Sequence, residues 1–180
     1  MKFKITPQSI PDVLLIEPTV YADERGYFKE SYNLKDFEEF LPGVKFVQDN
    51  ESKSTRGVLR GLHFQKAPHA QAKLIKVMQG SIWDVAVDIR QESPTFKQYC
   101  FADITAENHH QFFVPRGFAH AFLVTSDTAI VQYKTDNFYE PTADAGIHPH
   151  DPELNIPWPL PRDEHILCEK DYLLPGLSTL

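Results

Sequence analysis

Hydrophobic and polar residues alternate along much of the chain in short runs. The clearest run covers residues 81–89, where Trp83 and Val85 fall on one side and Asp84 and Asp88 fall on the other. This period of two is typical of a β-strand, whose successive side chains point to opposite faces. Residues 81–89 are therefore expected to form a strand.

Similar runs recur through the rest of the sequence and are separated by turn signals. Glycine follows a polar residue at Gln79-Gly80 and at Arg116-Gly117, where we expect turns. The other runs predicted to be strands are residues 13–16, 28–32, 46–49, 73–78, 98–103, 111–114, 119–124 and 129–135. Many short strands with such turns favour an all-β sandwich or barrel.

One helix is predicted, over residues 34–40. Asn33 precedes it as a candidate N-cap, and Pro42-Gly43 ends it. The segment 149–161 is rich in proline and is expected to be irregular. No internal repeat, linker or low-complexity tract divides the chain, so a single domain over residues 1–180 is expected.

Composition narrows the functional classes. The 180 residues are 42% hydrophobic and 12% aromatic, which is ordinary for a soluble domain with a sizeable core. A formal net charge of -7 disfavours nucleic-acid binding, which needs dense Lys and Arg surfaces, although a few cations in one pocket still suit an anionic small ligand. No apolar run approaches membrane-spanning length, the start lacks a secretion signal, and the only cysteines are Cys100 and Cys168. We therefore expect no membrane association and a cytoplasmic location.

Two residues with complementary chemistry lie close in the sequence: His63, in the stretch RGLHFQ, and Lys73, ten residues later. A histidine can take a carbon-bound proton near neutral pH, and an ammonium can hold the enolate oxygen that results. The pair therefore suits proton abstraction next to a carbonyl group. A histidine and a lysine in strands are also common as structural or solvated residues, so the pair alone does not decide the function.

Strand parity divides the side chains of a predicted strand between two sides, one of which must be the interior in a small barrel. Lys73 falls on the same side of its predicted strand as Ile75 and Val77, and Tyr133 shares a side with Val131. An interior lysine is costly unless it is paired or used. Tyr133 is either a functional residue or a core tyrosine whose hydroxyl is satisfied.

The parity of Arg60 and His63 is opposite, which argues against a shared face. Gly57 and Gly61 lie in the same stretch and would allow a β-bulge. A bulge places one extra residue in a strand and resets the parity beyond it. The two side chains then face one site only if such a bulge is present.

Motifs spread along most of the chain add a more specific signal. They are residues 23–28 (DERGYF), 48–50 (QDN), 56–65 (RGVLRGLHFQ), 68–73 (PHAQAK), 84–90 (DVAVDIR), 93–96 (SPTF), 115–124 (PRGFAHAFLV), 133–134 (YK) and 169–171 (EKD). In this order they resemble the dTDP-4-dehydrorhamnose 3,5-epimerase family of cupin-type enzymes. The resemblance implies an all-β cupin jelly roll (double-stranded β-helix) with additional N-terminal strands and short helices. It also implies a homodimer in which N-terminal strands pair across the interface.

The resemblance implies a reaction as well. Family members use no cofactor and epimerise C3 and C5 of dTDP-4-dehydro-6-deoxy-D-glucose, giving dTDP-4-dehydro-L-rhamnose for dTDP-rhamnose biosynthesis. The open alternatives are an enzyme that inverts C3 alone, a ketoisomerase acting on the same nucleotide sugar, and a non-catalytic cupin that binds sugar nucleotides.

Four residues match the family's catalytic positions. His63 resembles the base that removes the C3 and C5 protons, and Asp171 resembles the carboxylate that orients its imidazole. Lys73 resembles the residue that holds the C4 oxygen as an enolate. Tyr133 resembles the acid that returns a proton from the opposite face, because a single base would give back the proton that it took.

Eight further residues match positions that bind substrate. The resemblance implies that Arg25, Arg60 and His120 contact the diphosphate and that Gln48 and Asn50 make other polar contacts. It also implies that Phe28 and Glu30 contact the thymine ring and that Tyr139 lines the sugar pocket. Alternatively, Arg25 is a solvated turn residue and Tyr139 is only the end of the strand that carries Tyr133.

The histidines do not follow the pattern of a metal site. Metal-binding cupins usually present two histidines one residue apart, whereas here Gln65 takes the second position after His63. His109-His110 would point to opposite sides of any strand, and His148 and His150 lie in a loop interrupted by proline. No glycine-rich dinucleotide fingerprint is present. We therefore expect neither a metal nor a cofactor.

Three places depart from the family's pattern. Cys168 stands where members often have serine beside the matched carboxylate, Asp171. Tyr172 follows that carboxylate where some members carry a nucleotide-binding residue, and residues 144–151 lack the expected arginine- and tryptophan-containing form. These differences bear on affinity and base preference rather than on the reaction.

Overall fold

The computed structural model describes residues 2–179. In chain order its strands are β1 (Phe3–Pro7), β2 (Leu14–Pro18), β3 (Tyr21–Asp23), β4 (Gly26–Phe28), β5 (Gln48–Thr55), β6 (Leu59–Gln65), β7 (Lys73–Gln79), β8 (Ser81–Asp88), β9 (Tyr99–Thr105), β10 (Gln111–Val114), β11 (Phe118–Val124), β12 (Thr128–Thr135) and β13 (Asp144–Gly146). Its α-helices are α1 (Leu34–Phe40) and α2 (Glu169–Tyr172), and 3-10 turns lie at Pro141–Ala143, Arg162–Glu164 and Leu177–Thr179. No helix in this part of the chain is long and apolar enough to cross a membrane.

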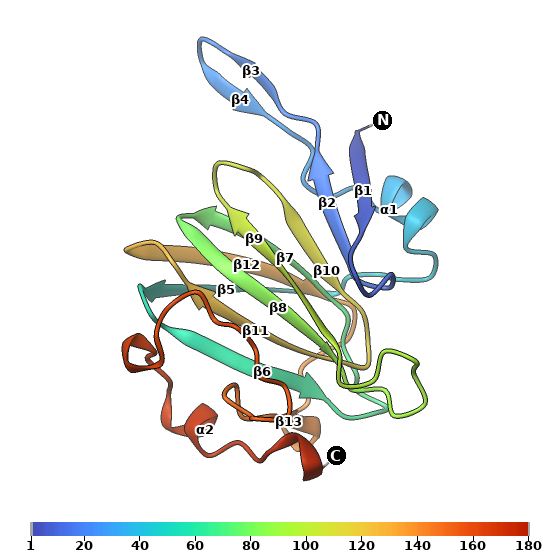
Figure 1. Ribbon diagram of the computed structural model, residues 1–180. Coiled ribbons are helices and arrows are strands. Elements are labelled where there is room, and N and C mark those ends of the chain that lie inside the picture. Colours follow the sequence, from blue (N-terminus) through green and yellow to red (C-terminus); the bar gives the residue numbers. More distant parts are fainter. Residues whose placement is uncertain (1, 180) are drawn as a thin grey trace.

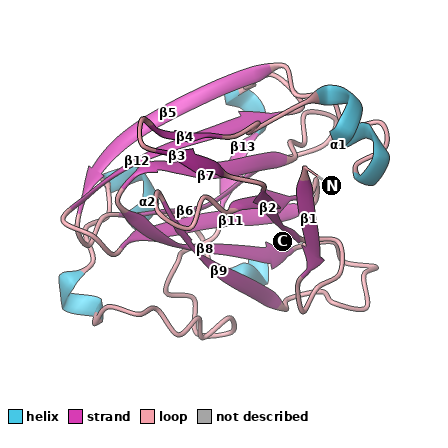
Figure 2. Cartoon of the chain, turned by 90° about the horizontal axis from the view of Figure 1, so that it is seen from above, coloured by secondary structure: helices cyan, strands magenta, loops and turns pink. Residues whose placement is uncertain are grey.

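Two antiparallel sheets form the body of the molecule. One sheet has six strands in the order β1-β2-β10-β7-β12-β5, and the other has five in the order β13-β6-β11-β8-β9. Figure 2 shows them as stacked layers, with β5, β12 and β7 over β6, β11 and β8. The β3–β4 hairpin stands away from both sheets (Figure 1). The all-β jelly roll expected from the sequence is confirmed.

Inward-facing side chains of the two sheets fill the space between them. Ile75 and Val77 of β7 and Ile82 and Ala86 of β8 belong to one buried apolar cluster. The other side of β8, which carries Trp83, is covered by apolar residues of the C-terminal tail. This strand is therefore buried on both faces, including the face that carries its two aspartates.

Most predicted elements lie where the sequence pattern put them. The helix at residues 34–40 is present, and the Asn33 side chain accepts a hydrogen bond from the Lys35 N–H at 3.0 Å, so the predicted N-cap is confirmed. Segment 149–161 contains turns and bends but no helix or strand, as expected from its prolines. Residues 111–114 form β10 with the predicted bounds.

One strand prediction is wrong, and another is only partly right. Residues 28–32 are not a strand, because β4 ends at Phe28 and the Ser31 carbonyl accepts from the Gln111 side chain at 2.7 Å instead of joining a ladder. The strand placed at residues 46–49 begins at Gln48 and runs to Thr55. It lies at the edge of its sheet with one side polar and exposed, so it lacks the alternating apolar residues that reveal a half-buried strand.

A β-bulge resets the parity of β6. His120 of β11 pairs with His63, and Phe122 pairs with Arg60. The step from one pair to the other is two residues along β11 and three along β6, so β6 contains one extra residue. Cross-strand partners point to the same side of a sheet, and His120 and Phe122 share a side. Arg60 and His63 therefore both face inward. Gly61 lies at the bulge with φ of +121°, and a Cβ there would come within 2.5 Å of the His120 carbonyl oxygen.

Candidate active site

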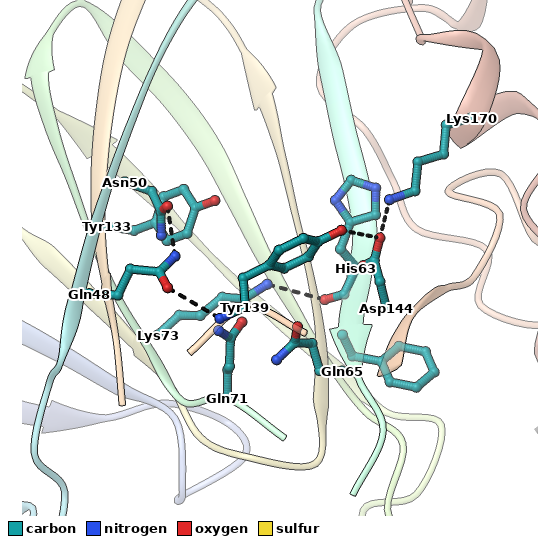
Figure 3. Close-up of a pocket in the computed structure, with 11 residues that line it drawn as sticks. Gln48, Asn50, His63, Gln65, Gln71, Lys73, Tyr133, Tyr139, Asp144 and Lys170 are labelled. Atoms are coloured by element: carbon teal, nitrogen blue, oxygen red, sulfur yellow. Dashed lines mark hydrogen bonds and ion pairs between the residues drawn. The ribbon is translucent and has the colours of Figure 1, made fainter. Parts of the chain in front are cut away.

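A cavity of about 180 Å³ opens between the two sheets. Strands of both sheets, the segment after β12 and helix α2 contribute to its wall (Figure 3). The lining residues are Gln48, Asn50, His63, Phe64, Gln65, Gln71, Lys73, Tyr133, Tyr139, Asp144 and Lys170. Most of these side chains are polar and several ionise, so the cavity suits a polar ligand and proton transfer.

His63 and Asp171 form a hydrogen-bonded pair at one wall. Nε2 of His63 lies 2.6 Å from Oδ1 of Asp171, and the Gly61 N–H donates to Oδ2 at 3.2 Å. Burial of Asp171 acts to raise its pKa, but its hydrogen bonds, first that from His63, hold the pKa below the ordinary value. The ionised carboxylate therefore accepts the Nε2 proton, which leaves Nδ1 as the basic nitrogen of the neutral imidazole.

Asp171 reaches His63 because the C-terminal tail folds back along β6. Val58 and Ile166 form a parallel bridge, and the Leu59 N–H donates to the Ile166 carbonyl at 3.0 Å. These bonds bring α2 beside β6. The pairing of His63 with Asp171 therefore depends on the docking of a distant segment.

Lys73 enters the cavity from β7. Its ammonium donates to the His63 carbonyl oxygen at 3.3 Å (Figure 3). Burial lowers the pKa of Lys73 to about 8, against the opposing effect of Asp84 and Asp144. Of the two sides of this strand, the one that carries Lys73 and Ile75 therefore faces the interior between the sheets, and the ammonium is available to stabilise a developing oxyanion.

Tyr133 projects into the cavity from β12, in the sheet opposite that of His63. Its ring packs against the apolar cluster between the sheets, and burial raises its pKa while the positive charge of Arg60 acts the other way. Figure 3 shows the hydroxyl turned toward the side of His63. Within residues 2–179 this hydroxyl has no hydrogen-bond partner in the protein. Tyr133 therefore lines the cavity with its hydroxyl available to a bound ligand, while its ring packs in the apolar cluster.

Two predicted polar contacts lie on the edge strand β5. The Gln48 side chain donates to Oδ1 of Asn50 at 3.0 Å and accepts from the Tyr139 N–H at 3.2 Å. These bonds fix the segment after β12 against β5. Gln48, Asn50 and Tyr139 therefore all line the cavity, as expected.

Five lining residues were not predicted as site residues: Phe64, Gln65, Gln71, Asp144 and Lys170. The Tyr139 hydroxyl donates to Oδ2 of Asp144 at 3.2 Å, and the Lys170 ammonium forms an ion pair with the same oxygen. Lys170 directly precedes Asp171, and Asp144 opens the segment that departs from the family's pattern. Apart from these two positions in the sequence, nothing indicated that Lys170 and Asp144 would line the cavity.

Arg60 and His120 lie beside the cavity without lining it. The Arg60 side chain donates to Oγ of Ser54 at 3.1 Å. His120 is buried, with Nε2 2.6 Å from Oδ1 of Asp84. Their predicted contacts to a diphosphate stay predictions.

The residues predicted to bind the nucleotide from the N-terminal strands lie away from this cavity. Arg25 forms an ion pair with Asp23 on the hairpin, and Phe28 is 67% exposed. Glu30 binds the Lys2 ammonium at 2.8 Å. None of the three predicted residues lines the cavity of its own chain.

Gln65 occupies the position where a metal-binding cupin would present a second histidine. Its amide donates to the carbonyls of His69 and Phe138 at 2.7 and 3.2 Å, and its oxygen accepts from the Glu140 N–H at 2.7 Å. Gln65 therefore holds two loops together. Among the described residues, no group of three or more His, Cys, Asp or Glu is arranged to hold a metal ion.

The three departures from the family's pattern lie around the site. The Cys168 thiol is one of the groups that hydrogen-bond to Asp171, and Tyr172 is 67% exposed beside them. Segment 144–151 begins with the cavity residue Asp144. All three positions therefore border the dyad or the cavity mouth.

Comparison with known proteins gives one family. The family model described as dTDP-4-dehydrorhamnose 3,5-epimerase matches residues 7–179. The dTDP-4-dehydrorhamnose 3,5-epimerase of Shigella flexneri is 52% identical over 163 residues, which cover 90% of this chain and 89% of that protein.

Solved structures agree over the whole length. The crystal structure of dTDP-4-dehydrorhamnose 3,5-epimerase from Elizabethkingia anophelis NUHP1 matches with a TM-score of 0.94 and 50% identity, covering 99% of this chain and 98% of that one. The dTDP-6-deoxy-D-glucose-3,5-epimerase of Legionella pneumophila, in complex with dTDP-4-keto-L-rhamnose, matches with a TM-score of 0.95 and 44% identity. That match covers 99% of this chain and 94% of the Legionella chain.

Proposed function

The chain belongs to the dTDP-4-dehydrorhamnose 3,5-epimerase family, and on this basis we propose that His63, Lys73 and Tyr133 carry out the family's reaction. The protein is an isomerase of dTDP-rhamnose biosynthesis. It converts dTDP-4-dehydro-6-deoxy-D-glucose into dTDP-4-dehydro-L-rhamnose by inverting C3 and C5.

The observation that carries this assignment is a base and an acid on opposite walls of one cavity. His63 projects from the five-stranded sheet, and Tyr133 projects from the six-stranded sheet. A sugar ring bound between them presents one face to each residue. Taking a proton from one face and returning a proton to the other inverts the carbon, which is what an epimerase has to do.

The first half of the reaction is proton removal. Nδ1 of His63 takes the proton from C3, and the electron pair of the broken C–H bond forms a C3–C4 double bond while the C4 carbonyl becomes an enolate. The Lys73 ammonium binds the enolate oxygen, and the Asp171 carboxylate stabilises the imidazolium. The negative charge of the enolate therefore develops next to the Lys73 ammonium, and the positive charge of the imidazolium develops next to the Asp171 carboxylate.

The second half is proton return. Tyr133 donates its hydroxyl proton to C3 from the other face, and the enolate collapses to the ketone with C3 inverted. The raised pKa of Tyr133 keeps it protonated before this step. Solvent then restores the proton on Tyr133 and removes the one on His63. The same sequence at C5 completes the product.

For the nucleotide end, we propose a homodimer in which the hairpin of one subunit serves the cavity of the other. Phe28 and Arg25 lie on a projecting hairpin, away from their own cavity, with Phe28 67% exposed. In a dimer, Phe28 and Glu30 contact the thymine ring, while Arg25 and Arg60 bind the diphosphate. Arginine suits the diphosphate because its planar fork binds phosphate oxygens in pairs.

We also propose a cytoplasmic location. Both cysteines are free, with Cys100 buried and Cys168 exposed. Unpaired cysteines are typical of a reducing compartment. Detection of the protein in the cytosolic fraction of its source cells, and not in secreted or membrane fractions, tests this point.

The function is tested by incubating the substrate with the protein in deuterated water and analysing the sugar by NMR. The proposal requires deuterium at both C3 and C5 and an L-configured product. Deuterium at C3 alone would indicate a C3-specific epimerase, and a product whose carbonyl has moved would indicate a ketoisomerase. Binding without exchange at either carbon would indicate a sugar-nucleotide-binding protein.

A further inference from the structure

A second carboxylate and imidazole pair lies fully enclosed between the sheets. Asp84 of β8 has no exposed surface, and its Oδ1 lies 2.6 Å from Nε2 of His120. The other oxygen of Asp84, Oδ2, has no hydrogen-bond partner in the described part of the chain. A buried carboxylate with a free oxygen is costly unless a positive charge compensates it.

Asp84 and Lys73 face the same space from opposite sheets. On β8, Asp84 shares its side with Ile82 and Ala86, and on β7, Lys73 shares its side with Ile75. These three apolar residues belong to one cluster between the sheets. The Asp84 carboxylate and the Lys73 ammonium therefore both point into the space between the two sheets.

We propose that Asp84 is a positioning residue of the epimerase: its charge compensates the Lys73 ammonium, and its Oδ1 holds His120 in the tautomer with the proton on Nε2. The inference rests on the proposed role of Lys73 in binding the enolate oxygen. A buried amine without a compensating charge loses its proton more easily, and with it the charge that stabilises the enolate. Asp84 thus acts through Lys73 and needs no contact with the substrate.

The charges around Lys73 support this role. The ionisable groups around it come from five strands, from the segment after β12 and from α2. They are His63 (β6), Asp84 (β8), His120 (β11), Tyr133 (β12), Asp144 (β13), Tyr139 and Lys170. Burial lowers the pKa of Lys73 to about 8, and Asp84 opposes this more strongly than Asp144 does. Burial also lowers the pKa of His120 and raises that of Tyr133, so both are neutral near pH 7. Asp84 is therefore the main negative charge that keeps this amine protonated.

The direct test is the pH dependence of acetylation at Lys73 in the variant Asp84→Asn. Free protein is pulse-labelled with acetic anhydride at a series of pH values, and modification of Lys73 is measured by mass spectrometry, since only the neutral amine reacts. The pH midpoint for Lys73 is expected to fall by about one unit relative to wild type. An unchanged midpoint in the folded variant overturns the proposal.

Asp88→Asn is the matched control. Asp88 lies on the same strand and also has no exposed surface, but its carboxylate accepts hydrogen bonds from Arg90, Ser93 and Thr95. This variant is expected to lose stability and to keep the Lys73 midpoint of the wild type. A midpoint that falls equally in both variants would reflect general loosening and would also overturn the proposal.

A stability comparison covers the case in which Asp84→Asn does not fold. Lys73→Met leaves Asp84 as an uncompensated buried charge, whereas Lys73→Met combined with Asp84→Asn removes both charges. The double variant is therefore expected to unfold at a higher temperature than either single variant. A double variant in which the two losses simply add would overturn the proposal.

These measurements need no substrate, so they do not depend on what Lys73 does in the reaction. Turnover supplies the link to catalysis: in Asp84→Asn the alkaline limb of the kcat profile should move to lower pH by the same amount as the labelling midpoint. A shifted midpoint with an unmoved limb would overturn the positioning role and the proposed function of Lys73 together. An unmoved midpoint would overturn the role of Asp84 alone.

Discussion

Nε2 of His63 lies 2.6 Å from Oδ1 of Asp171, a residue 108 positions further along the chain. The bond joins β6 to the C-terminal tail and leaves Nδ1 as the only nitrogen of His63 that can take a proton from the substrate. The orientation of His63, the proposed base, therefore depends on how the tail docks as well as on the jelly roll itself.

Asp171→Asn is expected to lower kcat by about 10²-fold and to leave KM almost unchanged. The amide has the shape of the carboxylate but lacks the charge that stabilises the imidazolium. Steady-state kinetics measure the effect, and Glu169→Gln, an exposed carboxylate in the same short helix, serves as the control. Turnover as fast as that of the wild type would remove Asp171 from the mechanism.

Activity is expected to fall as the pH rises above about 8, because burial lowers the pKa of Lys73 to about 8 and the reaction needs its charged form. Lys73→Met keeps much of the side-chain length but not the charge, so its kcat should be low across the whole pH range. The kcat profile of the wild type from pH 6 to 10 checks the first point. Constant activity to pH 10 would show that the ammonium is not required.

The hairpin is expected to serve the cavity of the partner subunit. Neither His63→Ala nor the double substitution Arg25→Ala/Phe28→Ala should turn over efficiently as a homodimer, because one lacks the base and the other the nucleotide contacts. A heterodimer of the two contains one site with an intact base and an intact hairpin. Mixed dimers, prepared with two affinity tags, should therefore regain about half of the wild-type activity.

Complementation distinguishes this arrangement from its alternative. If each hairpin served its own cavity, both sites of the heterodimer would stay defective, and no activity would return. The oligomeric state of each variant, measured by light scattering, is the control. A monomeric wild-type protein would contradict the dimer directly.

Gly61→Ala is expected to destabilise the protein by about 2–3 kcal/mol and to impair catalysis. Gly61 has φ of +121°, and a Cβ there would lie 2.5 Å from the His120 carbonyl oxygen. Gly43→Ala is the matched control, since Gly43 also has a positive φ, +80°, but no atom within 4 Å of an added Cβ. Urea unfolding should give a clearly smaller loss for Gly43→Ala, and equal losses would argue against crowding at the bulge.

The sequence was informative wherever chemistry or alternation is local. The side that Lys73 shares with Ile75 and the N-cap at Asn33 follow from residues a few positions apart, and both are confirmed. The full extent of strand β5 and the use of Lys170 and Asp144 were missed, because a polar edge strand lacks apolar alternation and the two side chains meet only after the tail docks. Tertiary contacts of this kind leave no periodic signal in the sequence.

The bulge in β6 could be predicted only in part from the sequence. Glycines at positions 57 and 61 made a bulge possible, but whether it forms depends on pairing with β11. Strand parity could not show that Arg60 and His63 face one site, whereas the resemblance of the motifs to the family named both as site residues.

We propose that His63 and Tyr133 act on opposite faces of the sugar, and this is tested by the fate of the C3 and C5 hydrogens when Tyr133→Phe turns over substrate in deuterated water. This change removes one hydroxyl and keeps the ring, so packing should hold. Proton removal by His63 should continue, giving deuterium at retained configuration or a product inverted at C3 alone, with slower turnover. Normal amounts of the doubly inverted product would contradict the role of Tyr133 as the acid and make it a structural residue.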